Sequence, residues 1–426
     1  MADSSKPADL RQVPVHWSLS AHARRLLVLA LAGVITAIVT GRPEFAGLAA
    51  PALVVLGTWR SDRSGEVSLR TSVPSTSLVE GVETTVRAEF RGQSDCEARL
   101  LIEPAESVSA GDAVIVPSGP AARAAGLRLE PVRWGRYSLG VLEITFTDRY
   151  RLFEGRAVAQ LPHVSCLPDP ARLARTVVLS RLPSRLGEHP ARTNGDGGEF
   201  AGVRQFVPGD RQRRINWSAT TRLGSLHLTT FAAERTQNVV VIADETTDIG
   251  EPGSSSLDLV LRGAAGVVTR YLAARDRVGL IIFGGRLSWI APGQGQRHHH
   301  RLLDLMISAP GGWERGSGLS RLPRAALPPG ALILVFSPLL DPRLIEALRD
   351  LRERGFSVLV VDVLNAAPAH DTSRLSRLTA RTWQLEQQAV RFSLTQIGVP
   401  VVHWDGASSL DEPLAPYTQR VMVAGR

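Results

Sequence analysis

Residues 238–244 read Asn-Val-Val-Val-Ile-Ala-Asp, an uninterrupted apolar run that ends on a carboxylate. Apolar runs without polar alternation are typical of strands that are buried on both faces of a parallel sheet. Helical patterns then alternate with strand patterns up to the C-terminus, the helical ones at 255–275, 297–308, 341–355 and 375–397. This alternation predicts a doubly wound, mainly parallel α/β sheet over residues 236–426, with ligands at the carboxyl ends of its strands.

Two apolar runs near the N-terminus, 26–40 and 45–59, are separated by a Gly-Arg-Pro-Glu break. Each run gives about 22 Å of helix against about 30 Å of bilayer hydrocarbon, so each is short for a span. The pairing, the turn-forming break and the bordering Arg and Trp residues still favour a transmembrane helical hairpin over residues 26–60. A signal peptide fits poorly, because apolar character resumes after the break. Residues 1–25 are then a polar N-terminal arm.

Basic residues around these runs predict the orientation of the hairpin. They lie mainly outside it, at Lys6, Arg11, Arg24, Arg25, Arg60, Arg63 and Arg70, whereas Arg42 alone lies between the runs. Positively charged flanks stay in the cytoplasm during insertion. We therefore expect a cell-membrane protein whose N-terminus and large C-terminal part are both cytoplasmic.

Residues 66–168 change to a period of two. Apolar residues alternate with polar ones at Val86, Ala88 and Phe90, and again at Leu142, Ile144 and Phe146. Such runs, separated by Gly, Pro and Ser clusters, predict a small antiparallel β-sandwich or barrel. Residues 169–197, rich in Arg, Pro and Gly, then form a linker.

The segment 198–235 concentrates unusual residues around a sharp reversal. A strand at 200–206 leads into Pro208-Gly209, and Asp210 is placed to cap a short helical segment before a strand at 226–231. Proline presets the first turn dihedral, glycine tolerates positive φ, and aspartate accepts from helix N–H groups. The pattern predicts a strand, a turn, a helix and a second strand.

Charged and aromatic side chains in this segment allow two interpretations. They form either a partly buried ion network that braces the turn or a surface that docks a partner or ligand. The residues in question are Glu199, Arg204, Phe206, Pro208, Gly209, Asp210, Arg213, Ile215, Asn216, Trp217 and Arg222.

This order of residues closely resembles the signature of a bacterial family catalogued as domain of unknown function number fifty-eight. The resemblance implies that residues 236–426 form a von Willebrand factor A-like domain and that a MoxR-type AAA+ ATPase is the partner. Asn216 stands where aspartate is also common in the family. The segment before the motif is similar as well, except that Arg149-Tyr150-Arg151 replaces Pro-Phe-Gly and is expected to reshape a turn.

The resemblance also implies a metal-ion-dependent adhesion site where the first strand of the sheet ends. Asp244 takes the first position of its Asp-x-Ser-x-Ser pattern, Thr246 replaces the first serine, and Asp248 puts a carboxylate where a hydroxyl is expected. Ser337 and Asp341 are available on a later loop. Oxygen ligands of this kind suit Mg²⁺. A working site and a metal-free structural version of the fold both remain open.

Several classes of chemistry are disfavoured. Lys6 is the only lysine, so a phosphate-binding Gly-x-x-x-x-Gly-Lys loop is excluded, and no Gly-x-Ser-x-Gly or Gly-x-Gly-x-x-Gly motif occurs. Consecutive histidines at 298–300 point in three directions on a helix, which favours a polar helix start over a ligand set. The net charge of +8 comes from scattered arginines, which does not indicate nucleic-acid binding. Cys96 and Cys166 lack a metal or redox spacing and are expected to be isolated thiols.

Three functional hypotheses follow. The first is a non-enzymatic adaptor or scaffold, anchored in the membrane, that presents the α/β domain to the ATPase or a client protein. The second is a divalent-metal-dependent enzyme that uses Asp244 and Asp248. The third is an extracytoplasmic adhesion module, which requires the inverted topology and a bond between Cys96 and Cys166.

Overall fold

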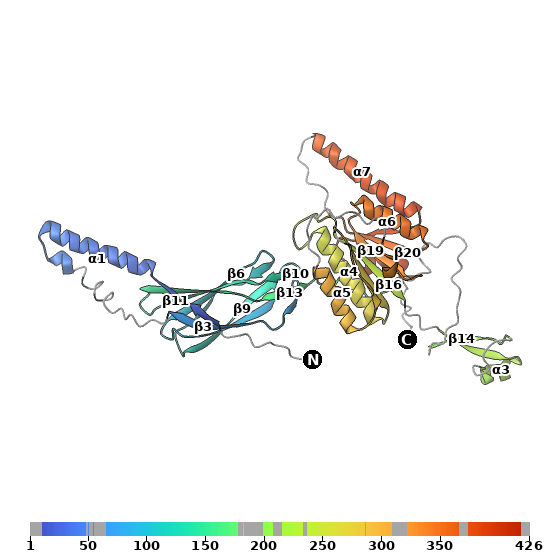
Figure 1. Ribbon diagram of the computed structural model, residues 1–426, viewed down its shortest axis with the longest axis horizontal. Helices are drawn as coiled ribbons and strands as arrows, with labels where there is room; N and C mark the ends of the chain where they lie inside the picture. The colour runs from blue at the N-terminus through green and yellow to red at the C-terminus, as the bar shows by residue number, and fades with distance from the viewer. Residues whose placement is uncertain are drawn as a thin grey trace. The chain divides into compact units, whose positions relative to one another are not determined.

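The chain divides into two compact units, Met1–Asp169 and Pro170–Arg426, each described here by itself. The computed structural model (Figure 1) describes residues 11–47, 50, 54, 65–177, 182, 199–207, 215–232, 237–285, 287–308, 322–365 and 374–418.

The first unit is built from mainly antiparallel sheets. One sheet contains, in spatial order, β1 (Arg11–Pro14), β3 (Glu66–Ser72), β5 (Thr84–Arg91), β9 (Ala122–Pro131) and β7 (Val108–Ala110). Another contains β2 (His16–Leu19), β12 (Phe153–Gln160), β11 (Gly140–Thr147), β6 (Glu97–Pro104) and β8 (Val114–Val116). A smaller sheet joins β10 (Gly135–Ser138), β13 (His163–Leu167) and β4 (Ser77–Val79), the last pair being parallel.

The two larger sheets share one apolar core, which makes this unit a β-sandwich. The alternation predicted for β5 and β11 is confirmed, because their alternate apolar side chains are buried in that core. Phe90 of β5 meets Phe146 of β11 edge to face, with ring centroids 5.9 Å apart. Cys96 and Cys166 are both buried, and no disulfide joins them.

The N-terminal segment is part of this sandwich rather than an arm over its whole length. Strand β1 pairs with β3, and β2 pairs with β12. Val13 and Val15 are buried in the core, and a Cβ added to Gly155 would lie 2.8 Å from Val15. Val13, Val15, Trp17 and Leu19 recur at every second position, so the segment carries a strand pattern that its overall polarity conceals, and pairing with β3 and β12 completes the two strands.

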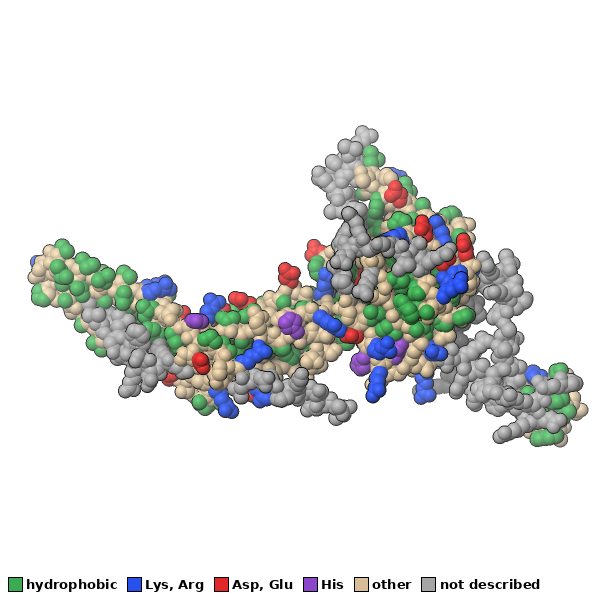
Figure 2. All heavy atoms as spheres, viewed as in Figure 1, with side chains coloured by type: hydrophobic (Ala, Val, Ile, Leu, Met, Phe, Trp, Pro, Cys, Tyr) green, Lys and Arg blue, Asp and Glu red, His purple; other side chains and the backbone are tan. Residues whose placement is uncertain are grey.

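Helix α1 (Ala21–Thr40) begins directly after β2 and starts five residues before the apolar run. The Ser20 side chain accepts a hydrogen bond from the Ala23 N–H and so caps the helix. Most of its large apolar side chains are exposed, as Figure 2 shows along the visible face. Within the described residues α1 is the helix long and apolar enough to cross a membrane. The expected second helix lies mainly outside the described residues.

The second unit contains a mainly parallel sheet. Its strands, in spatial order, are β18 (Ser288–Gly293), β17 (Arg277–Phe283), β16 (Asn238–Asp244), β19 (Leu332–Ser337), β20 (Ser357–Asp362) and β21 (Val401–His403). The edge strand β18 is antiparallel and was not predicted, because Pro292 and Gly293 hide its pattern. Proline is tolerated there because an edge strand leaves N–H groups without ladder partners.

Helices cover both faces of this sheet (Figure 1). The longer ones are α4 (Ser256–Ala273), α5 (Gln296–Ser308), α6 (Pro342–Glu353) and α7 (Arg374–Gln396), and their bounds lie within three residues of the predicted patterns. The short ones are α8 (Asp411–Leu414) and the 3-10 turns η3 (Arg324–Ala326) and η4 (Ala415–Tyr417).

Two glycines allow α4 to pack closely on both of its sides. A Cβ at Gly263 would lie 2.4 Å from the Phe336 ring of β19, and one at Gly266 would lie 2.3 Å from the Ala171 carbonyl oxygen. The second contact comes from residues 170–177, which we call the strap. Helix α4 is therefore enclosed between the sheet and the strap, which explains why it is apolar almost all round.

The strap belongs to the segment 169–197 that we expected to be a linker. Its Val177 N–H donates to the Tyr271 hydroxyl of α4 at 2.8 Å, and two successive N–H groups donate to the Asp411 carboxylate. The start of the expected linker is thus an integral part of the α/β unit.

Candidate functional site

The carboxyl ends of β16 and β19 meet where the strand order of the sheet changes direction, the place where open α/β sheets bind ligands. Asp244 ends β16 and Ser337 ends β19, and both side chains are fully buried. The structure therefore brings together two of the residues that the sequence places at this edge.

Asp244 has its carboxylate satisfied by protein donors. Its Oδ1 accepts from the N–H of Thr246 at 3.0 Å and from the Thr246 hydroxyl at 2.6 Å. Its Oδ2 accepts from the Ser337 hydroxyl at 2.5 Å. Burial raises the pKa of Asp244, while these three hydrogen bonds oppose the shift. The hydroxyl of Ser337 in turn accepts from the Leu339 N–H, so the group also braces the loop that follows β19.

Glu245 follows Asp244 and was not selected from the sequence. Burial, and secondarily the charge of Asp244, raise its pKa to about 8. Its Oε1 is buried without a hydrogen-bond partner, and the side chain lies against Gly284 after β17. No motif identifies this residue, because its environment comes from a strand distant in sequence.

The other residues expected to bind a metal, Asp341 and Asp248, form hydrogen bonds within the protein. Asp341 caps α6 and holds Arg343 through both carboxylate oxygens, with the shortest contact at 2.6 Å, and these contacts with Arg343 lower its pKa against the opposing effect of burial. Asp248 accepts from the Leu257 N–H near the start of α4.

The expected ligands differ in what they contact. Asp244 accepts from the hydroxyls of Thr246 and Ser337, which are themselves oxygen groups of the expected site, whereas the Asp341 carboxylate is paired with the Arg343 guanidinium. Over the described ranges, no group of three or more His, Cys, Asp or Glu side chains is placed to hold a metal ion. The expected site formed by Asp244, Thr246, Asp248 and Asp341 therefore stays a prediction, and the pairing of Asp341 with Arg343 disfavours Asp341 as one of its ligands.

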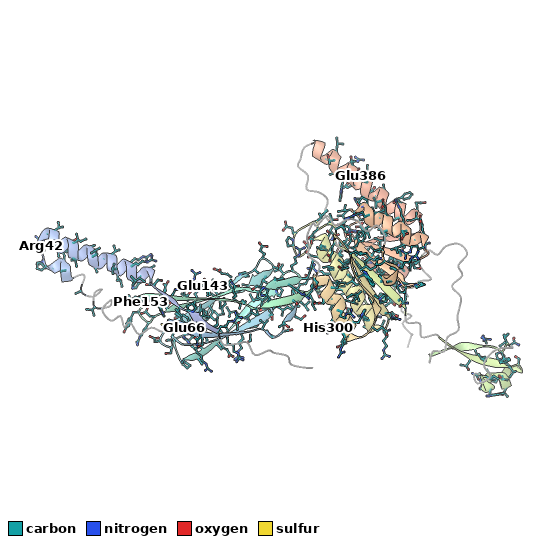
Figure 3. The ribbon with its side chains drawn as sticks, in the orientation of Figure 1. Arg42, Glu66, Glu143, Phe153, His300 and Glu386 are labelled. Atoms are coloured by element: carbon teal, nitrogen blue, oxygen red, sulfur yellow. The ribbon has the colours of Figure 1, made fainter. Side chains whose placement is uncertain are left out.

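The histidines at 298–300 are consistent with a polar helix start. His298 lies 2.7 Å from the Val278 carbonyl oxygen of β17, and His299 lies 3.3 Å from the Thr269 hydroxyl of α4. His300, labelled in Figure 3, shares no ligand geometry with them.

The signature segment forms a separate small structure that we call the hairpin module, residues 199–207 and 215–232. Strand β14 (Glu199–Gln205) pairs antiparallel with β15 (His227–Ala232), with a bulge near Gly202, and α3 (Trp217–Leu223) lies between them. The predicted order of strand, helix and strand is confirmed. Pro208, Gly209, Asp210 and Arg213 lie outside the described residues, as does the side chain of Glu199.

Asn216 explains where α3 begins. Its side chain accepts from the Ala219 N–H at 3.0 Å, and its amide donates to the Thr229 hydroxyl of β15 at 3.2 Å. Asparagine and aspartate are equally good helix N-caps, which accounts for either residue at this position. Helix α3 thus begins at Trp217, directly after the Asn216 N-cap, and the helical start expected at Asp210 lies outside the described residues.

The remaining signature residues lie along the module. Arg204 is half-buried opposite Leu228 and donates to the Gln205 carbonyl oxygen, and Phe206 donates its N–H to the Leu226 carbonyl oxygen. Ile215 forms a bridge with Leu228. Arg222 lies in the last turn of α3, where a positive charge complements the helix dipole.

The module exposes much of its apolar surface. Trp217 is 68% exposed, whereas Leu228 is 4% exposed and is the one buried apolar residue among those described there. The exposed large side chains are Val203, Val207, Trp217, Leu223 and Leu226. Of these, only Trp217 was selected from the sequence, because apolar residues at alternating spacing are first interpreted as core.

Comparison with known proteins bears on this part of the chain. Residues 202–372 match the family described as "Protein of unknown function DUF58". Uncharacterized proteins of Mycobacterium bovis and of two Mycobacterium tuberculosis strains are 27% identical over 127 residues, which cover 29% of this chain. The match spans 40% of the length of those relatives. Residues 202–372 are therefore similar to a bacterial family without an assigned activity.

Proposed function

We propose that this protein is a non-enzymatic adaptor, anchored in the membrane, that presents the hairpin module and the α/β unit to a MoxR-type AAA+ ATPase or its client protein. The observation that carries the proposal is the hairpin module, which exposes large apolar side chains and buries a single apolar residue, Leu228, among the side chains that the structure describes there. An isolated two-stranded hairpin is marginally stable in water, so this surface gains most from a partner.

The residue types exposed on the hairpin module support protein docking. Trp217 and Arg222 belong to residue types that dominate binding energy at protein interfaces. Strand β14 pairs only with β15 among the described strands, so its other edge is available to an added strand. The family resemblance supplies the identity of the proposed ATPase.

The α/β unit is proposed to be von Willebrand factor A-like. Its strand order, with an antiparallel edge strand next to two parallel ones, and the buried Asp244 at the end of the first strand support this assignment. In this proposal the contacts of Asp244 with Ser337 and Thr246 hold the loops of the docking face without a metal.

The connectivity of the β-sandwich supports membrane anchoring by an even number of crossings. Strand β1 precedes α1, strand β3 follows the second apolar run, and the two strands pair with each other. Both ends of the intervening segment must therefore lie on one side of a membrane. If α1 crosses, residues 41–65 have to return the chain, as the predicted hairpin would. The basic flanks favour the cytoplasmic side.

Cleavage after α1 would oppose this arrangement. It would remove Val13 and Val15 from the sandwich core and leave Gly155 facing an empty groove. An anchor that stays attached is therefore the better interpretation of α1 than a signal peptide.

The docking proposal is tested by affinity purification of the full chain from membranes with nucleotide present. Trp217→Ser should reduce the recovered ATPase by about tenfold or more, the scale of an interface hot spot. Trp289→Ser on β18, which is also partly exposed, is the matched control and should leave recovery unchanged. Equal recovery with both variants, at unchanged melting temperatures, would contradict the assignment of the docking surface.

Topology is tested separately with reporter tags at the two termini. Both tags should respond from the cytoplasmic side. Tags on opposite sides of the membrane would contradict an anchor compatible with a closed β-sandwich.

A further inference from the structure

Helix α7 carries two apolar faces, and the sheet uses only one of them. Val390 and Leu394 pack into the core formed with α6 and the sheet. Leu378, Leu385 and Phe392 are 56%, 57% and 66% exposed. Residues seven apart return to nearly the same side of a helix, so these three form one stripe. Phe392 lies two positions from both Val390 and Leu394, which places the stripe on the opposite side from the core.

Folding of the α/β unit does not require this stripe. Arg391, near its end, forms an ion pair with the buried Asp362 of β20 at 2.5 Å, which fixes the C-terminal part of α7 on the sheet. The helix has 23 residues, about 35 Å in length, and its N-terminal half extends past this attachment (Figure 1). The exposed stripe therefore needs an explanation outside the fold.

The charge of α7 selects one kind of partner. The helix contains four arginines and a single acidic residue, Glu386 (Figure 3). Arg377 and Arg381 are exposed, and Arg381 falls between Leu378 and Leu385 along the helix. A basic helix with an exposed stripe of leucine and phenylalanine has the pattern of helices that lie in the interface of an anionic bilayer. Its net positive charge opposes pairing with an identical helix.

We propose that α7 binds an anionic lipid surface through Leu378, Leu385 and Phe392, with Arg377 and Arg381 contacting the headgroups. This inference rests on the membrane anchoring proposed above, since a tethered chain keeps α7 close to a negatively charged leaflet. Contact of α7 with the bilayer would restrict the orientation of the α/β unit at the membrane.

The experiment uses the full chain carrying Ala389→Cys, an exposed position on the stripe that leaves its three large side chains intact. Because Cys96 and Cys166 are fully buried, an environment-sensitive fluorophore should label the new thiol selectively. The protein is reconstituted in vesicles of phosphatidylcholine, or of phosphatidylcholine and phosphatidylglycerol in equal parts. In the mixed vesicles we expect a blue-shifted emission and loss of quenching by aqueous iodide. In pure phosphatidylcholine we expect neither.

Two controls make the result specific. Arg377→Ser with Arg381→Ser should abolish the shift, whereas Arg349→Ser, an exposed arginine of α6, should retain it. A label at Glu346→Cys on α6 should stay quenched in both vesicles. High salt should reverse the shift, because it screens exposed charges within a few ångströms.

The outcomes separate this proposal from the anchoring. Protein that floats with the mixed vesicles while its α7 label stays quenched would overturn the lipid contact and leave the anchor in place. A shift that occurs equally in detergent and disappears on dilution would assign the stripe to a second copy of the chain. Protein that floats with neither vesicle would reject both the anchor and the lipid contact.

Discussion

The central sheet and the hairpin module differ in how much of their apolar side-chain surface is buried. Strands β16 and β19 bury almost every residue between two layers of helices. The module buries Leu228 and leaves a tryptophan and several aliphatic side chains exposed. Burial of apolar area is the main favourable term in folding, so the sheet holds most of the stability of its unit. This difference supports the proposal that binding, rather than folding, removes the apolar surface of the module from water.

The largest expected effect is on the free energy of unfolding, and it compares a buried position in the sheet with an exposed position in the module. Ile242→Ala in β16 removes a fully buried side chain, and we expect a loss of about 2–5 kcal/mol in the free energy of unfolding. Val203→Ala in β14, which is 40% exposed, should change it by less than about 0.5 kcal/mol. Denaturant unfolding of the full chain measures both. Similar losses would show that the module is part of the cooperative core.

A second effect concerns the buried carboxyl groups at the edge of the sheet. The pKa of Glu245 is raised to about 8, above the ordinary value of 4.5, mainly because the side chain is buried. The folded state thus binds more protons than the unfolded state between these two values, so stability is highest below the lower one and declines as pH rises towards the upper one. Glu245→Gln should reduce that decline.

The measurement is the melting temperature of the wild-type chain and of Glu245→Gln between pH 5 and pH 9. Glu346→Gln, an exposed carboxyl on α6, is the control and should follow the wild type. Parallel pH profiles for all three proteins would show that Glu245 does not titrate in this range.

A smaller effect is confined to the module. Asn216→Ala removes the N-cap of α3 and should cost about 1 kcal/mol of local stability, whereas Asn216→Asp should be nearly neutral. Hydrogen exchange should show faster exchange in α3 of Asn216→Ala, with no change in β16 or β19. Faster exchange in those strands as well would mean that the module and the sheet unfold together.

The smallest effect concerns the turn between β11 and β12. Arg151 has a φ of 54°, in the left-handed region, at the position where the resembling family tends to carry glycine. The turn therefore has the backbone conformation that glycine favours, at a steric cost of about 1–2 kcal/mol that the greater chain entropy of glycine partly offsets. Arg151→Gly should stabilise the sandwich by at most about 1 kcal/mol. Thermal melting tests this, and a clear loss would show that the arginine side chain has a stabilising contact.

The parts predicted well are those whose burial follows from local pattern. Val86, Ala88 and Phe90 alternate because one face of β5 meets the core, and the helices of the α/β unit repeat because one side of each packs on the sheet. The parts predicted poorly depend on distant partners. Residues 11–14 form strand β1 because they pair with β3. The strap is held on α4 because its Val177 N–H donates a hydrogen bond to the Tyr271 hydroxyl.

The features of the candidate site also divide into those that the sequence predicted and those that depend on contacts in the folded chain. Asp244 at the end of a buried strand could be identified from spacing, whereas Asn216 was not predicted to be the N-cap of α3. The pairing of Asp341 with Arg343 could not be predicted, although the two residues are only two positions apart. A sequence does not show which charged group a carboxylate contacts in the folded chain. The exposed stripe of α7 was also missed, since a helix with two apolar faces has the same composition as one that is buried.

The sequence by itself determined the class of fold, the apolar segment of α1 and the strand, helix and strand of the module, because each follows from short-range periodicity and capping. Only the tertiary structure decided that the N-terminal strands close the sandwich, that hydroxyls and an arginine satisfy the expected metal ligands, and that apolar side chains of the module and of α7 face solvent. Those outcomes depend on which residues distant in sequence meet, and hence on the free energy of the whole chain.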